Sequence, residues 1–142
     1  MSRCERDSYH DQSLPLVAGF DRIAFRVDSD SARRCALLAA TEAAQQQGMQ
    51  GMSDLQGYDA MIFRFPQDTS VQFINHFVPI DLAIGWYDAD GVLVDHTTMD
   101  KCPSGENCPL YASKAPYRYA VETPASLGLP GAGATLHVGG SC

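Results

Sequence analysis

The sequence predicts a mainly β fold of the α+β class, an antiparallel β-sandwich or barrel-like sheet of about seven or eight strands with one helix packed on it. Short apolar runs that alternate with period two recur along the chain, and Gly, Pro and Asp residues separate them at near-regular spacing. One run rich in Ala, Leu and Gln is long enough for a helix. The 142 residues, 45% of them hydrophobic, match one domain with its own core.

We expect two parts in the chain, an N-terminal arm with a first strand (residues 1–20) and a single β-rich domain (residues 21–142). Residues 1–13 are polar and show no period, which is typical of an arm that is ordered only where something holds it. Residues 14–20 and 22–27 alternate apolar with polar side chains. The alternation predicts two strands.

The next segment predicts the only long helix. Residues 29–31 are Ser, Asp and Ser, which favour the N-cap position, and residues 32–47 are rich in helix-forming side chains up to Gly48. Glycine is common just past a helix C-terminus. The remaining strands are expected at six segments, residues 60–65, 71–75, 81–87, 92–97, 117–122 and 135–138.

The segment Asp88-Ala89-Asp90-Gly91 begins like a calcium-binding loop, with carboxylates at alternate positions. The residues that follow are Val92, Leu93 and Val94, and no bidentate Glu stands at the required place. A turn that ends on a glycine is common in hairpins. We therefore interpret the segment as a hairpin turn and predict no metal site.

The charge of the chain excludes several classes of partner. Ten basic residues stand against seventeen acidic ones, for a net charge of −7, so no basic surface for nucleic acid is expected. No apolar run reaches the length of a membrane span. The first residues also lack the apolar segment of a signal peptide, which leaves open a cytosolic protein or one whose export signal has been removed.

The five cysteines match no structural zinc pattern. Cys102 and Cys108 flank a turn-rich segment, which favours a local disulfide over two reduced thiols. Cys4 and Cys142 form a second candidate pair, because the ends of domains often lie close together, and this pairing would leave Cys35 as a buried helix thiol. A disulfide would imply an oxidising compartment.

Three polar residues gather around Pro79. Asn75, His76 and Asp81 combine an amide, a base and an acid at a bend between two strands, where they could bind a ligand. The structural alternative is that Asp81 caps a turn, Asn75 satisfies loop backbone and His76 lies at the rim of the sheet.

Glu122 is a further candidate because glutamate is rare in this chain and this one lies in an apolar, aromatic strand. If its side chain points inward, it must be paired, with Arg118 or Arg64 as partners, or have a raised pKa. If it points outward, it is a solvated charge. The period of the strand leaves both orientations open.

The order of these segments resembles the family called domain of unknown function 192. The similar stretches are residues 48–52, 58–65, 71–82, 87–92 and 119–122, which together extend over most of the chain. The resemblance implies a mainly β sandwich with a helix on one side, in proteins that are usually exported or membrane-tethered and have no established activity.

Within these stretches Asn75, Pro79, Asp81 and Glu122 agree with the polar and turn positions of the family pattern. The chain departs from the pattern at four places, where Met52, Gln72, Ile74 and His76 replace Arg, Trp, Lys and Thr. The resemblance therefore supports Asn75, Asp81 and Glu122 as ligand-binding residues and supplies no mechanism.

We expect an extracytoplasmic or secreted module that binds a small polar ligand, such as a carbohydrate, through Asn75, His76, Asp81 and Glu122. Strand aromatics could stack on sugar rings, although alternation places neighbouring aromatics on opposite faces of a sheet. No catalytic residue, metal or cofactor is assigned.

Two alternatives differ in class from a binding module. The chain could be an assembly subunit that self-associates when its N-terminal arm adds a strand to a neighbouring sheet. It could also be a hydrolase that uses Asp81 or Glu122 with His76, which requires a defined separation between the two carboxylates.

Overall fold

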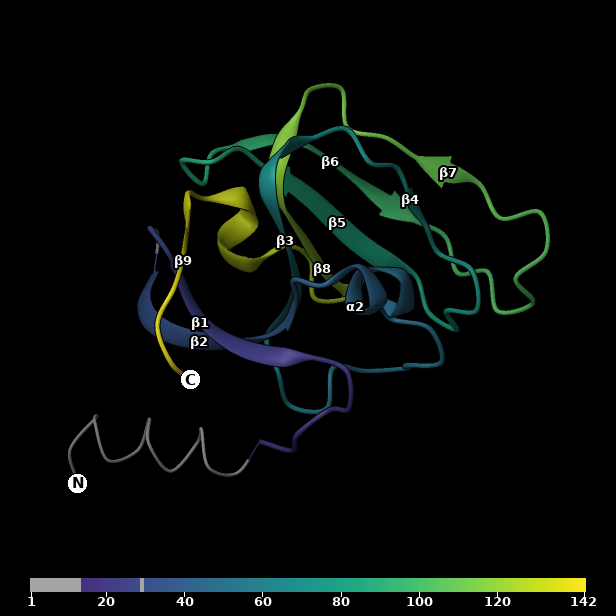
Figure 1. The fold of residues 1–142 in the computed structure, drawn as a ribbon, viewed down its shortest axis with the longest axis horizontal. Coiled ribbons are helices and arrows are strands. Elements are labelled where there is room, and N and C mark those ends of the chain that lie inside the picture. The colour runs from purple at the N-terminus through teal and green to yellow at the C-terminus, as the bar shows by residue number, and fades with distance from the viewer. Residues whose placement is uncertain (1–13, 29) are drawn as a thin grey trace.

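The computed structural model describes residues 14–28 and 30–142 and is mainly β, as the sequence predicts. Seven strands form one sheet that curls into a half-barrel, in the order β6-β5-β8-β3-β2-β1-β9, and β4 pairs with β7 in a second sheet (Figure 1). β2 and β3 run parallel, so the sheet is mixed where we expected antiparallel pairing alone. The elements are β1 (Asp21–Val27), β2 (Asp30–Ala39), α2 (Glu42–Gln47), β3 (Ala60–Thr69), β4 (Phe73–Ile74), β5 (Leu82–Tyr87), β6 (Leu93–Met99), β7 (Leu110–Tyr111), β8 (Tyr117–Pro124), a 3-10 turn (Pro130–Gly133) and β9 (Leu136–Val138).

The helix predicted over residues 32–47 is wrong over half of its length. Residues 30–39 form β2, which pairs with β1 on one side and β3 on the other, and α2 spans six residues. Side chains from 35 to 39 are buried on both faces of the sheet, so β2 lacks the alternation that marks a half-buried strand. Pairing on both edges outweighs the modest helix propensity of its Ala and Leu residues.

The cap expected at residues 29–31 lies instead at Thr41, whose hydroxyl accepts the N–H of Ala44 at 3.1 Å. Gly48 ends α2 with a φ of +46°, which confirms the predicted C-terminal glycine. The side-chain amide of Gln45 donates to the carbonyls of Ala39 and Arg64. These bonds fix the helix to the end of β2 and the middle of β3.

The strand predicted at residues 14–20 is also wrong, because these residues form no strand. The hydroxyl of Tyr58 donates to the carbonyl of Pro15 at 2.7 Å, so the segment is held against the domain outside the sheet. β9 pairs with β1 and occupies the edge that a preceding strand would need. The rest of the expected arm, residues 1–13, lies outside the described residues.

The seven other predicted strands are present, with β4 shortened to two residues, and β7 is an addition that we did not expect. The hairpin predicted at residues 88–91 joins β5 to β6. One carboxylate oxygen of Asp88 accepts the N–H groups of Asp90 and Val92, both at 2.9 Å, and Gly91 has a φ of +82°. The hairpin interpretation is thus confirmed.

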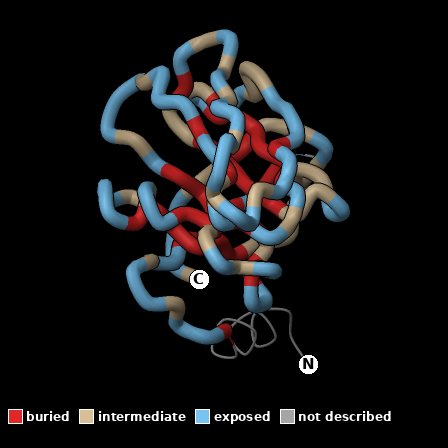
Figure 2. The backbone as a smooth tube through the Cα atoms, turned by 90° about the vertical axis from the view of Figure 1, so that its right-hand side faces the viewer, coloured by how far each residue is buried: buried red, intermediate tan, exposed pale blue. Residues whose placement is uncertain are grey.

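Two hydrophobic clusters cover the two faces of the sheet. The larger cluster includes Met61, Phe63 and Trp86 from the sheet and contacts α2 and the loops beside it, whereas Ile62 and Tyr87 belong to the smaller one. Trp86 and Tyr87 therefore lie on opposite faces, as alternation predicts, but both are fully buried and neither offers a stacking surface. Figure 2 shows the buried segments at the centre of the molecule, beneath exposed loops.

Two disulfides cross-link the described chain. Cys102 and Cys108 are bonded, as predicted, with their Cα atoms 5.9 Å apart. Cys142 is bonded to Cys35, so the pairing of Cys142 with Cys4 is wrong, and Cys35 is a bonded strand residue rather than a free helix thiol. Cys4 lies outside the described residues. Within residues 14–28 and 30–142, no helix has the length and apolar character needed to cross a membrane.

Candidate functional site

A cleft of about 570 Å³ opens between α2 with the turn that follows it and the segment of residues 71–78. Its apolar lining includes phenylalanines from β3 and β4, and amide side chains surround its mouth. The elements around it are labelled in Figure 1. The lining residues are Glu42, Gln45, Gln46, Gln47, Gly48, Met49, Gln50, Phe63, Phe65, Val71, Gln72, Phe73, Ile74, Asn75, His76, Val78 and Glu122.

Hydrogen bonds hold the wall formed by residues 71–78 in place. At its start, the hydroxyl of Tyr117 on β8 donates to the carbonyl of Val71. Near its end, the N–H of Gly51 donates to the carbonyl of Phe77 at 2.8 Å and joins this wall to the turn after α2. The cleft is therefore preformed.

Glu122 lies at the floor of the cleft on β8, between Met61 of β3 and Ile84 of β5. Its side chain points to the face covered by the larger hydrophobic cluster, and the residue is only 4% exposed. Burial disfavours the charged carboxylate and raises the pKa of Glu122 from 4.5 to about 8. The Glu122 side chain therefore points inward, and of the two consequences expected for that orientation, a partner or a raised pKa, the raised pKa applies.

Neither arginine that the sequence offered as a partner pairs with Glu122. Arg118 forms an ion pair with Asp68 at 2.9 Å, and Arg64 is exposed. Among the described residues, none forms a hydrogen bond or ion pair with the Glu122 carboxyl. A buried carboxyl without a protein partner is uncommon, because desolvation is costly unless another group compensates it.

His76 lies at the opposite wall of the same cleft. Its Nε2 is 3.5 Å from the amide nitrogen of Gln50, and its Nδ1 is buried with no hydrogen-bond partner in the described part of the chain. This ring nitrogen is an unsatisfied polar atom that is itself closed to solvent.

Asn75 also lines the cleft, but its amide serves the backbone. Its Nδ2 lies 3.3 Å from the carbonyl oxygen of Ile80, 3.4 Å from that of Met99 and 3.1 Å from that of Asp100, and the residue is only 1% exposed. These contacts tie the 75–80 loop to the end of β6. The role of Asn75 in satisfying loop backbone is the structural alternative raised from the sequence.

Asp81 is separated from the other three candidates. It is exposed, its carboxylate accepts the N–H of Lys101 at 2.8 Å, and it lines a different, shallow depression beside Pro79 and Pro124. The structure therefore brings Asn75, His76 and Glu122 to one cleft and leaves Asp81 as a turn cap. Among residues 14–28 and 30–142, no three His, Cys, Asp or Glu side chains lie close enough to hold a metal ion.

The glutamine-rich wall of the cleft was not predicted. Gln45, Gln46 and Gln47 fell in the predicted helix of residues 32–47 and Gln50 just beyond it, and polar residues of a surface helix normally face water. The signal that was available is their density, since four amides occur within six residues and none of the six is charged.

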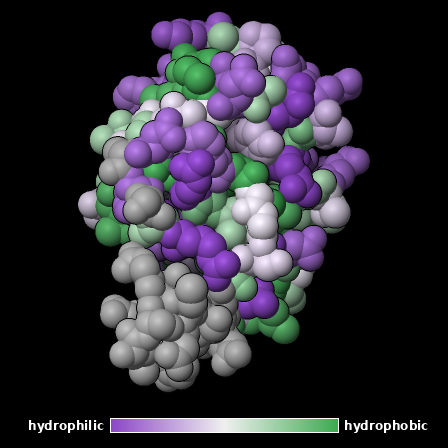
Figure 3. All heavy atoms as spheres, turned by 90° about the vertical axis from the view of Figure 1, so that its left-hand side faces the viewer, coloured by the Kyte–Doolittle hydropathy of each residue, from purple (hydrophilic) through white to green (hydrophobic). Residues whose placement is uncertain are grey.

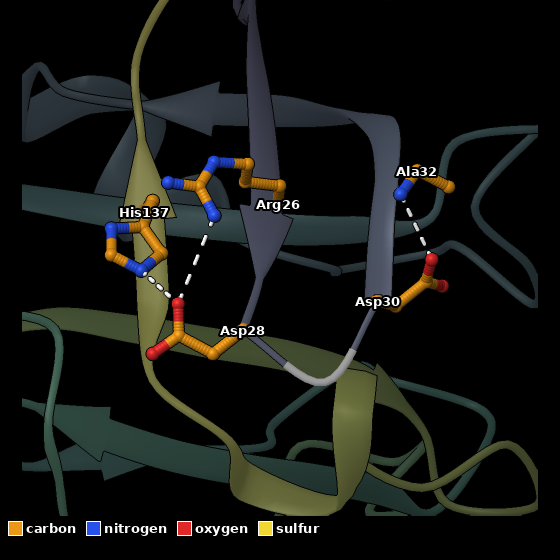
Figure 4. Close-up of polar contacts among 5 residues, drawn as sticks. All are labelled: Arg26, Asp28, Asp30, Ala32 and His137. Atoms are coloured by element: carbon orange, nitrogen blue, oxygen red, sulfur yellow. Dashed lines mark hydrogen bonds and ion pairs between the residues drawn. The ribbon is translucent and has the colours of Figure 1, made fainter.

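A second polar cluster lies where β9 pairs with β1 (Figure 4). One carboxylate oxygen of Asp28 lies 2.5 Å from the Nε2 of His137 and 3.7 Å from the guanidinium of Arg26. Close by along the chain, the Asp30 carboxylate accepts the N–H of Ala32. Figure 3 views the molecule from this side and shows hydrophilic side chains over much of the surface. All three groups around Asp28 are substantially exposed, so this cluster holds β9 to the β1–β2 hairpin and is a weak candidate for a binding site.

Two solved structures resemble the fold. A protein from Sinorhizobium meliloti 1021, described as a candidate transcription regulator, superposes with a TM-score of 0.64 at 17% identity over 87% of this chain and 97% of its own. A protein of unknown function from Novosphingobium aromaticivorans DSM 12444 superposes with a TM-score of 0.65 at 20% identity, over 88% of this chain and 91% of its own. No curated protein matches the sequence. At these identities the two structures support the fold alone.

The family comparison agrees with the motifs found along the chain. The family DUF192, described as Uncharacterized ACR, matches residues 25–128, which include the cleft walls and Glu122. The chain belongs to the DUF192 family.

Proposed function

We propose that this protein is an extracytoplasmic binding module that takes a small polar ligand into the cleft between α2 and residues 71–78, with no catalysis assumed. The observation that supports the proposal is the Glu122 carboxyl, which lines the cleft and has no hydrogen-bond or ion-pair partner among the described residues. Folded proteins pair nearly all buried polar groups, so a ligand that bonds to this carboxyl would supply a partner that the described residues do not.

The shape and lining of the cleft fit this role. A volume of about 570 Å³ is typical of small-molecule sites, which are mostly apolar with a few polar groups that orient the ligand. The amides of Gln46, Gln47 and Gln72 line the mouth of the cleft and can both donate and accept hydrogen bonds. A carbohydrate is one ligand class that such amides and the nearby phenylalanine rings would suit.

The two disulfides support a location outside the cytoplasm, because structural disulfides persist mainly in oxidising compartments. Alkylation of the protein in intact cells, followed by mass spectrometry, tests this part of the proposal. Both bridges should resist alkylation before reduction. Modification of all four thiols in unreduced cells would contradict an oxidising location.

Binding itself is tested by an NMR screen of sugars and small metabolites against the wild type, Gln50→Ala and His76→Ala. Both substituted residues line the cleft and are only half-buried, so their replacement should weaken a hit without unfolding the protein. Asp81→Ala is the matched control, because Asp81 lies outside the cleft. The proposal fails if no compound binds, or if the control weakens binding as much as the two cleft variants.

Self-association through the N-terminal arm stays a prediction, since residues 1–13 lie outside the described structure. Light scattering on the full chain and on a chain lacking these residues measures it. The hydrolase alternative is not carried forward for Asp81, which caps the Lys101 turn away from the cleft. Its form with Glu122 and His76, which line the same cleft, stays a prediction.

A further inference from the structure

The charged groups that line the cleft have one sign. Glu122 lies at the floor, Glu42 lies at the mouth, and no Lys or Arg is among the described residues that line it. His76 is the only other titratable side chain of the lining. A cleft with acidic groups and partly desolvated walls concentrates the field of those acids and attracts cations.

We propose that the ligand of this cleft is a small organic ammonium ion with apolar substituents, held by the carboxylate of Glu122 and surrounded by phenylalanine rings. The inference rests on the proposed function, because it names the chemical class that the same cleft binds. It rests on the geometry of a buried, unpartnered carboxyl in the lining of a preformed cleft.

The ligand would supply the missing partner of Glu122. An ammonium group beside the carboxyl compensates the desolvation that otherwise keeps the acid protonated, and it thereby lowers the pKa of Glu122. Binding at neutral pH converts the carboxylic acid to a carboxylate, and the released proton passes to solvent. The resulting ion pair replaces a neutral acid that has no partner among the described residues.

The remaining lining suits the rest of such a cation. Phe63, Phe65 and Phe73 come from β3 and β4, and aromatic faces attract quaternary and alkylated ammonium groups more than they attract neutral groups of the same shape. Amide oxygens at the mouth can accept the N–H groups of a primary amine. The lining is therefore apolar around the substituents and acidic at the charge.

Few other charges act on Glu122 from the elements packed around it. On β3 the nearest cation is Arg64, which is exposed, and on β5 Tyr87 lies on the opposite face of the sheet. From α2 comes Glu42 and from the facing wall His76.

Calorimetric titration with choline and with benzyltrimethylammonium tests the inference, because both probes keep their charge at every pH. The uncharged analogue 3,3-dimethylbutan-1-ol is the matched control ligand. Cation affinity should rise about tenfold per pH unit up to about pH 8, as Glu122 ionises. Near neutral pH the binding of each cation should release close to one proton, which titrations in buffers of different ionisation enthalpy measure.

Glu122→Gln should weaken cation binding at least tenfold and remove most of the pH dependence, whereas Glu42→Gln at the mouth should change affinity less than threefold. The pH profile of the wild type tests the inference without any variant, so a folding defect in Glu122→Gln or Glu42→Gln would not prevent the test. Equal binding of the alcohol and the cations, or sugar binding without cation binding, overturns the inference and leaves the proposed function standing. If neither the cations nor the neutral compounds bind, both fail.

Discussion

Replacing Glu122 with glutamine removes one titrating group from the core while keeping its shape and polarity. In the wild type the pKa of Glu122 is about 8 in the folded protein, against 4.5 for an exposed glutamate. The folded state therefore binds more protons than the unfolded state between these two values, and stability falls as the pH rises through that window. At about 1.4 kcal/mol per pKa unit, the loss in unfolding free energy reaches about 5 kcal/mol above pH 8.

Glu122→Gln should abolish this loss. Urea unfolding of oxidised wild type and variant should give similar free energies near pH 4.5 and a variant that is more stable by several kcal/mol near pH 9. Glu106→Gln, in an exposed loop, is the matched control and should follow the wild type. If the difference between wild type and Glu122→Gln does not grow with pH, the carboxyl is not buried as described here.

Three further changes test the frame around the cleft by chemical denaturation. Gly91→Ala should lower the free energy of unfolding by roughly 3 kcal/mol or more, because the new Cβ would lie 1.9 Å from the carbonyl oxygen of Leu136. Gly128→Ala is the control: this glycine also has a positive φ but open space around it, so the loss should be about 1 kcal/mol. Asn75→Ala removes an amide nitrogen that lies within 3.4 Å of three carbonyl oxygens, and it should lower the free energy of unfolding by about 2–3 kcal/mol; a neutral result would mean that water replaces the amide. Replacing both Cys35 and Cys142 with alanine should lower the free energy of unfolding by about 5 kcal/mol, and removing the Cys102–Cys108 disulfide should lower it by about 2 kcal/mol. The losses differ because the first disulfide closes a loop of 107 residues in the unfolded chain and the second a loop of 6. Equal losses for the two bridges would contradict this loop-length argument.

Local patterns in the sequence predicted most of the strands, but they did not predict which strands pair with one another in the sheet. Turn residues such as Gly91 and period-two alternation act over a few positions, and they located seven of the nine strands in the described part of the chain. The β2 strand escaped because burial on both faces removes alternation, and Ala and Leu then favour a helix. Because Cys35 was placed in that helix, its bond to Cys142 was missed as well.

The candidate site shows the same division. The sequence singled out Glu122 as an acid among apolar residues but left its orientation open, since a shift of one residue in register reverses every side chain of a strand. Asp81 and Asn75 looked equally functional, yet one caps a turn and the other holds a loop. Which polar groups share a cleft depends on pairings between β3, β5 and β8 that no local pattern encodes.

The position of Glu122 on β8 has a consequence for how the cleft meets a ligand. β8 is hydrogen-bonded to β3 on one side and to β5 on the other, so its backbone cannot swing outward as a loop would. The Glu122 carboxyl can gain or lose a proton while the backbone that carries it stays in place. Recognition in this cleft would thus need little reorganisation of the protein, and selectivity would follow from how well a ligand matches a rigid site.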